Sequence, residues 1–293
     1  MMTGILIINK PQNWTSHDVV AKMRRLLGEK RIGHGGTLDP MATGVLPLFV
    51  GRATRAVEFA ENVEKEYIAG LRLGLVTDTQ DTTGSVLETY DVNVSEETLI
   101  RVLKGFKGER LQVPPMYSAV KIGGKKLYEY AREGKSIKRP ARKILIKELE
   151  LLSFDGTEVS LRIVCSKGTY VRTICHDIGR LLGCGGGMSG LIRMRSGVFD
   201  INRALTIEEV EQAAKNGEAA SLLLPVDTLF LEFGSLKLDK KEEKRCRNGA
   251  RINKAGVVQG RYRVYSEDGE FLMLGEVRPD GQLVTIKNFF EIK

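Results

Sequence analysis

The sequence predicts a mixed α/β fold with a smaller β-rich unit after it. Short apolar runs typical of strands are interleaved with amphipathic repeats typical of helices along most of the chain. Short β-rich runs separated by turn residues follow toward the C-terminal end. The 293 residues suffice for one large domain plus a small one. The change of pattern near Pro225-Val226-Asp227 predicts domains of residues 1–225 and 226–293.

The first predicted elements are a strand, a helix and a second strand. Gly4–Asn9 is a β-branched run that Lys10-Pro11 ends. Ser16-His17-Asp18 offers an N-cap for a helix through about Leu27. Residues 45–50 are an apolar run that predicts a buried strand. The helix has an apolar face, which consists of Val19, Val20, Met23, Leu26 and Leu27.

Later segments continue this pattern. Residues 64–73 alternate apolar and polar side chains, with Tyr67 on the apolar face, and predict a strand. Residues 159–165 also read as a strand, and residues 175–182 as a helix. Because a C-terminal domain this short buries little surface, we expect it to dock on the larger one. Three dipeptides typical of hairpin turns divide that domain: Asn248-Gly249, Asp268-Gly269 and Asp280-Gly281.

The composition is that of an ordinary globular protein, with 42% hydrophobic and 28% charged residues. No apolar run approaches the ~20 residues that span a bilayer. No basic leader precedes an apolar stretch at the start, so we expect no secretory signal. The four cysteines include no C-x-x-C pair, and only three histidines occur. This argues against a zinc site and predicts reduced thiols in a cytoplasm.

The positive charge is concentrated in one segment. The net charge is +8, yet residues 104–143 alone contain twelve basic and three acidic residues. The rest of the chain is therefore close to neutral. A concentrated basic patch favours a nucleic-acid partner over a scattered, solvated surface. Binding to an anionic membrane is a weaker alternative, because the segment has no sustained amphipathic helix.

A single carboxylate lies in a glycine-rich loop. Gly33, Gly35 and Gly36 allow unusual backbone conformations and close approach of a ligand. Asp39 follows, with Pro40 disfavouring helix at Asp39. A second turn at residues 42–44 then leads into the apolar strand. This is the rigid support that a reactive group requires, although Asp39 could instead only hydrogen-bond the backbone of its own turn.

The polar run Thr77–Gly84 is superficially like a calcium loop. It lacks the glycine midway and the glutamate that ends such a loop, so we expect no metal there. A polar turn after the strand is sufficient to explain it.

The stretch 33–47, G-H-G-G-T-L-D-P-M-A-T-G-V-L-P, closely resembles the signature of the bacterial tRNA pseudouridine-55 synthases of the TruB type. Three further blocks resemble that family in the same order and span nearly the whole chain. They are K-E-Y at 65–67, the P-P-x-Y-S-A-x-K and G-K-x-L-Y-E-Y-A-R blocks within 114–132, and G-T-Y-x-R at 168–172.

The resemblance implies three catalytic residues. In that family Asp39 is the catalytic carboxylate, and the ring of Tyr67 stacks on the target base. Arg172 pairs with Asp39 and so keeps it ionised, as a nucleophile or base requires. Taken alone, Tyr67 would be a core residue, and Arg172 a surface charge or a phosphate contact.

The resemblance also implies substrate-binding residues around this group. His34 fills the space that the extruded base leaves, and Leu191 packs under the base. Tyr170 belongs to the G-T-Y-x-R motif. Lys10, in a family-like N-K-P start, supports the site, although an exposed strand end is an equal alternative. His34 would otherwise be a loop residue with a backbone hydrogen bond.

The basic segment 104–143 resembles the family's insertion that closes over RNA like a thumb. Lys121, Lys125 and Lys126 are interleaved there with tyrosines, which suits phosphate contact and stacking. Just before Leu191, Gly186-Gly187-Met188 departs from the family pattern. Three consecutive glycines, Gly185 included, suggest a looser loop.

The architecture that the resemblance implies is a largely antiparallel sheet, followed by a small β-barrel-like domain of the PUA type. This second domain has a basic edge, which consists of Lys240, Lys241, Lys244, Arg245, Arg247 and Arg251.

The activity that the resemblance implies is isomerisation of uridine 55 in the T-arm of tRNA to pseudouridine. The target base is flipped out of its stack, and no cofactor or metal is required. We expect a monomer that recognises the folded shape of the T-arm without a guide RNA. Asp39 either attacks the ribose or removes a sugar proton, and the sequence does not distinguish these routes.

Two other functions remain as alternatives. An RNA-binding module or chaperone could use the basic patch without chemistry, but binding alone does not require Asp39, Tyr67 and Arg172. A guide-RNA-dependent synthase shares the aspartate loop, but the thumb-like insertion favours the stand-alone enzyme. A glycosidase is remote, because that chemistry usually takes two facing carboxylates.

Overall fold

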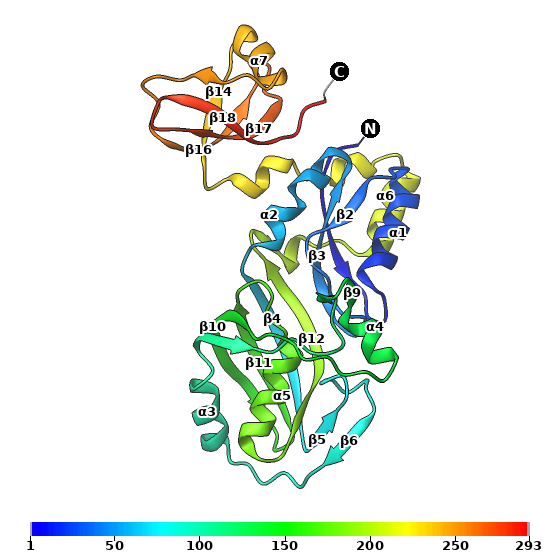
Figure 1. Cartoon of the computed structure of the whole chain (residues 1–293). Coiled ribbons are helices and arrows are strands. Elements are labelled where there is room, and N and C mark those ends of the chain that lie inside the picture. The colour runs from blue at the N-terminus through cyan, green and yellow to red at the C-terminus, as the bar shows by residue number, and fades with distance from the viewer. Residues whose placement is uncertain (1, 292–293) are drawn as a thin grey trace.

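The computed structural model describes residues 2–291 and contains two main sheets (Figure 1). The larger sheet forms the body of the molecule, and the smaller one stands at one end of it. The predicted mixed α/β class is confirmed. Among the described residues, no helix is long and apolar enough to cross a membrane.

The larger sheet is nine-stranded, in the order β1-β3-β12-β4-β11-β10-β7, with β2 on β3 and β13 on β12. Every pairing is antiparallel except the short contact between β12 and β3. The largely antiparallel sheet that the resemblance implied is therefore present. Its strands are β1 Gly4–Lys10, β2 Ile32–His34, β3 Thr43–Val50, β4 Lys65–Leu73, β7 Gly108–Gln112, β10 Arg142–Phe154, β11 Glu158–Cys165, β12 Gly186–Ser196 and β13 Phe199–Asp200.

Helices cover this sheet, and the main apolar core lies between them. Side chains of β4 alternate strictly between buried and less buried positions, as predicted. Apolar residues of α1, α3 and α5 pack on its buried face. The helices are α1 Ser16–Leu27, α2 Val57–Glu61, α3 Glu96–Lys104, α5 Val171–Leu182 and α6 Ile207–Lys215, with 3₁₀ helices η1 Gly51–Ala56, η2 Ile201–Arg203, η3 Ala219–Leu222 and η4 Val226–Phe230.

The helix α1 has the predicted length but a different N-cap. Thr15, not the Ser16-His17-Asp18 group, caps the helix: its hydroxyl accepts from the Asp18 N–H at 3.0 Å, and Asp18 accepts from the Thr15 N–H at 2.8 Å. This reciprocal capping box satisfies two backbone donors. Ser16 is then free to bond elsewhere, and it contacts the loop that precedes Asp39.

The prediction of a loose loop at Gly185–Gly187 is wrong. Gly186 and Gly187 are buried residues of β12, paired with Leu73 and Arg72 of β4. A Cβ at Gly186 would lie 2.9 Å from the Leu71 side chain and 3.0 Å from the backbone of Gly179. Glycine is therefore required for close packing of α5 on the sheet, and not for flexibility.

Only part of the basic segment 104–143 leaves the sheet. Residues 108–112 form β7 and pair with β10, which already includes Arg142 and Lys143. The excursion between them contains the hairpin of β8 Lys121–Ile122 and β9 Lys125–Lys126, followed by α4 Leu127–Arg132. A second two-stranded sheet consists of β5 Leu75–Thr77 and β6 Val86–Thr89.

The smaller sheet is five-stranded, in the order β14-β16-β17-β18-β15, with one helix, α7 Lys240–Arg247. Asp268-Gly269 and Asp280-Gly281 lie in the turns after β16 and β17, as predicted. Asn248-Gly249 is not a hairpin, because it follows the C-terminal end of α7. The strands are β14 Gly234–Lys237, β15 Ile252–Asn253, β16 Gly260–Tyr265, β17 Phe271–Val277 and β18 Gln282–Asn288.

The two sheets share an apolar cluster. Phe230 of η4, Leu274 of β17 and Phe289 pack in one buried cluster with Ile5 and Ile7 of β1. The C-terminal residues thus dock on the larger sheet, as expected for a unit with a small core. The boundary at residue 225 stays a prediction.

Candidate active site

The loop between β2 and β3 carries Asp39, and glycines with positive φ stand within the loop and at the start of β3. Gly36 has φ +107° and Gly44 has φ +101°, conformations that other residues rarely adopt. A Cβ at Gly44 would lie 2.3 Å from the carbonyl oxygen of Arg193. The second turn spans Asp39–Ala42, where the Ala42 N–H donates to the Asp39 carbonyl at 3.0 Å. It thus begins three residues earlier than predicted.

Asp39 forms a two-point ion pair with Arg172. Nε of Arg172 lies 2.9 Å from Oδ2, and Nη2 donates to Oδ1 at 3.3 Å. The Arg172 side chain is only 7% exposed, whereas that of Asp39 is 37% exposed. Arg172 therefore lies behind the carboxylate, which keeps an open side. The alternative in which Asp39 only bonds its own turn is not what the structure has.

Arg172 occupies the first turn of α5, which begins four residues before the predicted Cys175. The β-branched Val171 and Thr173 in this turn hide the helix from sequence patterns. Arg172 is held by backbone as well: it donates to the carbonyls of Thr79 at 3.1 Å and of Tyr117 at 2.8 Å.

A second carboxylate, Asp81, lies on the other side of Arg172. Its Oδ2 is 3.6 Å from Nη1 of Arg172, and its side chain is 6% exposed. The hydroxyls of Thr79 and Thr83 donate to Oδ1 of Asp81 at 2.9 and 2.6 Å. The polar turn 77–84 is therefore part of this site, which sequence reasoning missed. The run of threonines and aspartates at residues 77–83 is the local signal that could have indicated it.

The surroundings of Asp39 change its acidity. Burial raises the pKa of Asp39 above its ordinary value, and the Arg172 guanidinium opposes that rise. The negative charge of Asp81 raises the pKa further. A carboxylate that is partly removed from water, yet paired with a cation, is a stronger base and nucleophile than an exposed one.

Three side chains fix the loop by its backbone. Lys10 donates to the carbonyls of Pro11, Trp14 and Pro40, at 2.9, 2.6 and 3.2 Å. It is fully buried, so the alternative of an exposed strand end is wrong. Burial lowers the pKa of Lys10 to about 8. Ser16 bonds both backbone groups of Leu38, accepting from its N–H at 2.9 Å and donating to its carbonyl at 3.2 Å.

Arg193 is the third anchor, and sequence reasoning missed it. It follows Leu191 by two residues, so both side chains lie on one face of β12. Nε donates to the Val45 carbonyl at 2.6 Å, and Nη2 donates to the Gly36 carbonyl at 3.1 Å. Arg193 is the cross-strand partner of Tyr67 on β4, and its positive charge opposes the rise in the pKa of Tyr67 that burial causes.

These groups surround a pocket of about 410 Å³. Four predicted residues besides Asp39 line it: Tyr67, Tyr170, Arg172 and Leu191. Tyr67 and Leu191 are 7% and 9% exposed, so each offers mainly one surface, which faces the pocket. Tyr117 and Tyr128 of the excursion complete the wall. The pocket combines a reactive carboxylate with apolar and aromatic surfaces, which suits a planar ligand.

The other predicted residues do not line the pocket. His34 lies edge-on to His17, with ring centroids 5.6 Å apart, and burial lowers its pKa to about 4. In the excursion, Lys125 pairs with Glu133, while Lys126 lies over the ring of Tyr128. Lys121 is exposed.

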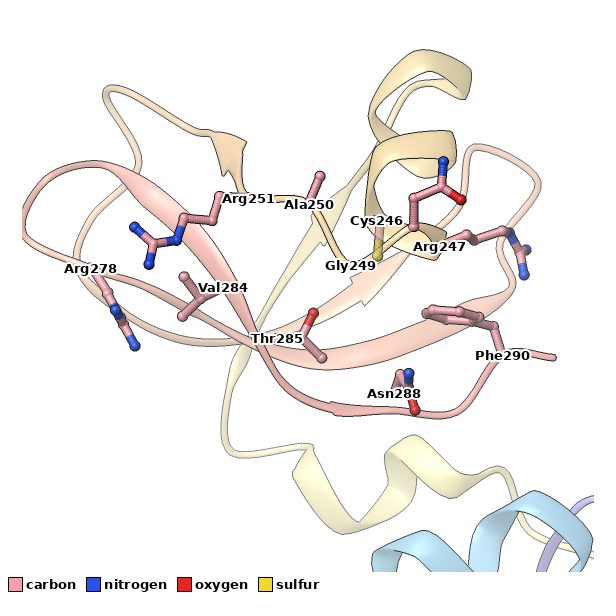
Figure 2. A pocket seen from close by; sticks show the side chains of 11 residues that line it. Cys246, Arg247, Gly249, Ala250, Arg251, Arg278, Val284, Thr285, Asn288 and Phe290 are labelled. Carbon is pink, nitrogen blue, oxygen red and sulfur yellow. The ribbon is translucent and has the colours of Figure 1, made fainter. Parts of the chain in front are cut away.

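A second pocket, of about 570 Å³, lies in the smaller sheet (Figure 2). Figure 2 shows Arg251 and Arg278 at one end of it and Arg247 with Phe290 at the other. None of its lining residues is acidic. The side chain of Asn288 borders the pocket and accepts from Nη1 of Arg55 at 2.6 Å, so η1, which follows β3, reaches its rim.

The chain matches three family models that follow one another along the sequence, and all three describe pseudouridine synthases. Residues 24–171 match the TruB family pseudouridylate synthase (N terminal domain). Residues 172–231 match the tRNA pseudouridylate synthase B C-terminal domain, and residues 234–285 match Pseudouridine synthase II TruB, C-terminal.

Individual proteins are similar over nearly the same length. The tRNA pseudouridine synthase B of Halalkalibacterium halodurans is 42% identical over 285 residues, which is 95% of this chain and 94% of that protein. The protein of the same name from Heliobacterium modesticaldum is 51% identical over 245 residues, 81% of this chain and 79% of that one.

Solved structures share the fold. A chain of a Cbf5–Nop10–Gar1 complex superposes with a TM-score of 0.75 at 27% identity, covering 99% of this chain and 85% of that one. A chain of an H/ACA RNP bound to a substrate RNA that contains 2′-deoxyuridine has a TM-score of 0.74 at 24% identity, with 99% and 86% coverage.

Proposed function

This chain belongs to the TruB family of pseudouridylate synthases and is an isomerase that makes pseudouridine in tRNA; from that premise we propose that its target is uridine 55 of the T-arm. The observation that carries the proposal is the partly exposed carboxylate of Asp39, held from behind by the buried Arg172 at the wall of an aromatic pocket.

The reaction exchanges one bond of the base for another. The bond from C1′ to N1 breaks, the uracil turns in place, and a bond from C1′ to C5 forms. The proton at C5 is lost and N1 gains one, so atoms balance without a donor, an oxidant or a reductant. Asp39 begins the reaction, either by attack on the ribose or by removal of a sugar proton, and both routes fit a carboxylate with one open side.

The base enters the pocket only after it leaves the helical stack, which costs a few kcal/mol. The pocket wall supports this step, because the ring of Tyr67 and the apolar side chain of Leu191 offer surfaces to a flipped uracil. His34, neutral at physiological pH because its pKa is about 4, fills the space in the RNA. The hydroxyl of Tyr67 takes part in the final proton transfer from C5.

The rest of the RNA is held by positive surfaces. Lys121, Lys125 and Lys126 of the excursion contact phosphates beside the pocket, and the exposed arginines of the smaller sheet contact a second part of the tRNA. The enzyme acts as a monomer without a guide RNA. Sequence relatives at 42% and 51% identity support this over the H/ACA assemblies, whose chains are 27% and 24% identical.

The decisive experiment incubates an unmodified tRNA transcript with the wild type and with Asp39→Asn, and maps pseudouridine along the RNA. We expect pseudouridine at position 55 with the wild type, none with Asp39→Asn, and tRNA binding by both. Asp155→Asn is the matched control, since Asp155 bonds only within its exposed turn.

The alternatives give different results. Pseudouridine at another position would contradict the proposed target but not the reaction. If the wild type binds tRNA but makes no pseudouridine, the alternative of an RNA-binding module without catalysis would be favoured. Full activity of Asp39→Asn would remove Asp39 from the chemistry.

A further inference from the structure

Arg193 is a buried cation without an anionic partner. Its side chain belongs to the largest fully buried ones, at 1% exposure. Within residues 2–291, no carboxylate oxygen lies within 4.0 Å of its guanidinium, whereas Arg172 has two carboxylate partners. Burial of an unpaired charge costs several kcal/mol even after relaxation. A neutral donor could bond the same backbone carbonyls at a smaller free-energy cost of burial. The positive charge of Arg193 is therefore expected to serve a further purpose.

The groups around Tyr67 indicate that role. Tyr67 is paired across the sheet with Arg193 of β12, both residues line the pocket together with Asp39, and Lys65 lies two residues away from Tyr67 on its own strand. Burial raises the pKa of Tyr67, and Cys165 and Asp39 add to the rise. Arg193 is the group that opposes it. Arg193 therefore favours a negative charge on this phenol.

Lys65 does not replace Arg193 in this role. Burial lowers the pKa of Lys65 to about 8, and its ammonium donates to the carbonyls of Glu61 and Val63 at 2.9 and 3.0 Å. These two bonds hold its ammonium at carbonyls at and just after the end of α2. Arg193, in contrast, bonds the carbonyls of the Asp39 loop and of β3 and is the cross-strand partner of Tyr67.

We propose that Arg193 is a positioning residue that lets the Tyr67 hydroxyl carry the proton from C5 to N1 at the end of the reaction. The inference rests on the proposed function. The phenol donates its proton to N1 of the rotated base, the transient phenolate faces the fixed guanidinium, and the phenolate then removes the proton at C5. Tyr67 ends protonated as it began, and charge and atoms balance.

A purely structural role would have a different signature. If Arg193 only held the loop, its loss would slow the first bond-breaking step through Asp39, and the C5–H bond would not limit the rate. If Arg193 acts through Tyr67, its loss slows the removal of that proton. A tRNA with deuterium at C5 of the target uridine distinguishes the two, because a C5–D bond breaks more slowly than a C5–H bond.

The test measures single-turnover rates for the normal and the 5-deuterated tRNA with Arg193→Gln and Arg193→Lys. Glutamine keeps hydrogen-bond donors but not the charge, and lysine keeps the charge. We expect Arg193→Gln to lower the rate about 100-fold, the size of a typical general acid–base contribution, and to gain an isotope effect. Arg193→Lys should recover part of the rate with a smaller isotope effect.

Arg195→Gln is the matched control, because Arg195 lies on the same strand but pairs with Glu64 and Glu66 outside the pocket. It should leave the rate and the isotope effect unchanged. Melting curves and tRNA affinity identify any variant that fails to fold.

Equal losses in both Arg193 variants without an isotope effect would overturn the inference. Tyr67→Phe gives an independent check, since it leaves Arg193 in place: it should show an isotope effect at least as large as that of Arg193→Gln, and its absence would also overturn the inference. Failure of the proposed function looks different, because the wild type would then make no pseudouridine at position 55.

Discussion

Two of the pockets in this molecule use their arginines in opposite ways. In the Asp39 pocket, Arg172 and Arg193 are almost fully buried and bond carboxylates and backbone carbonyls. In the pocket of the smaller sheet, Arg251 and Arg278 are exposed at the rim, and no acidic side chain lines the cavity (Figure 2).

Burial decides what each arginine can do. A guanidinium that is already fully bonded cannot also bind a ligand phosphate, but it holds other groups in place with several donors. An exposed guanidinium contributes little to stability and remains available for a phosphate. We therefore expect changes in the first pocket to alter rate and stability, and changes in the second to alter RNA affinity.

The largest expected effect is that of Arg172→Met on the rate. The change leaves Asp39 and Asp81 without their cationic partner in a partly buried site. The Asp39 carboxylate is then no longer held in one orientation. We expect kcat to fall about 10³-fold, comparable to loss of an oriented electrostatic group, with tRNA affinity little changed. Single-turnover kinetics and filter binding measure the two separately.

Arg162→Met is the control for this substitution, because Arg162 pairs with three glutamates on the other face of the sheet. A normal rate with greatly weakened tRNA binding in Arg172→Met would contradict the distinction between the two pockets, because a buried arginine would then act as an RNA contact.

The second effect is that of Lys10→Met on stability. Its ammonium bonds three carbonyls beneath the loop, and methionine cannot donate to them. We expect the free energy of unfolding to fall by about 3 kcal/mol, from carbonyls left without partners. Urea denaturation measures this, with Arg251→Met as a rim substitution that should change stability by less than about 0.5 kcal/mol. Equal losses in both would contradict the distinction between the pockets.

The third effect is the pH dependence of that stability. Burial lowers the pKa of Lys10 to about 8 in the folded state, against its ordinary value of 10.5 in the unfolded chain. Between pH 8 and 10.5 the unfolded chain binds more protons at Lys10 than the folded chain does. Lys10 therefore makes the free energy of unfolding rise with pH over this range, and the full free-energy cost of burying its charge is present below the folded pKa. The difference between wild type and Lys10→Met, measured from pH 7 to 10.5, should therefore grow in favour of the wild type. A flat difference would contradict the lowered pKa.

The smallest effect belongs to the second pocket. Arg251→Ala should weaken tRNA binding a few-fold and reduce the slope of log affinity against log salt by about 1, while kcat at saturating tRNA stays the same. Lys237→Ala is the control, since Lys237 is exposed on β14 at the opposite edge of the small sheet. A change in kcat with Arg251→Ala would show that the rim takes part in the chemistry.

Local sequence patterns predicted the elements whose side chains pack in a simple alternation. The strands β1, β3, β4 and β11 and most of α1 were expected within a few residues, because apolar periodicity reports directly which face is buried. The same reasoning fails where close packing requires small residues. The glycines of β12 resemble a loop in the sequence, because the residues that leave no room for a side chain there belong to other elements, α5 and β4.

The helix α7 shows a second kind of failure. Its residues are almost all charged, so it has no apolar face to detect, and six of the basic residues around it were expected only to form an edge. A local signal was nevertheless present: Asp239 and Glu242 form a capping box that marks the start of the helix.

The site residues that belong to sequence motifs could be predicted. Those whose role depends on contacts between distant parts of the chain could not. Asp39, Tyr67, Arg172 and Leu191 were singled out from motifs, and the structure brings all four to one pocket. Asp81 and Arg193 were not, because their importance depends on contacts across more than 90 and 140 residues respectively. Their roles and those of the four stay predictions until the variants are measured.

The position of β12 in the larger sheet has a consequence for how the protein is made. This strand lies between β3 and β4, and it is the only link between the β1–β3 part of the described sheet and the β4–β11–β10–β7 part. The β1–β3 part can form from nearby chain segments and the other part once β11 has been made, but their union awaits a strand that ends at Ser196. Asp39 belongs to one part and Tyr67 to the other. A nascent chain on the ribosome therefore holds two inert half-sites, and it becomes an enzyme only when the late strand closes the gap between them.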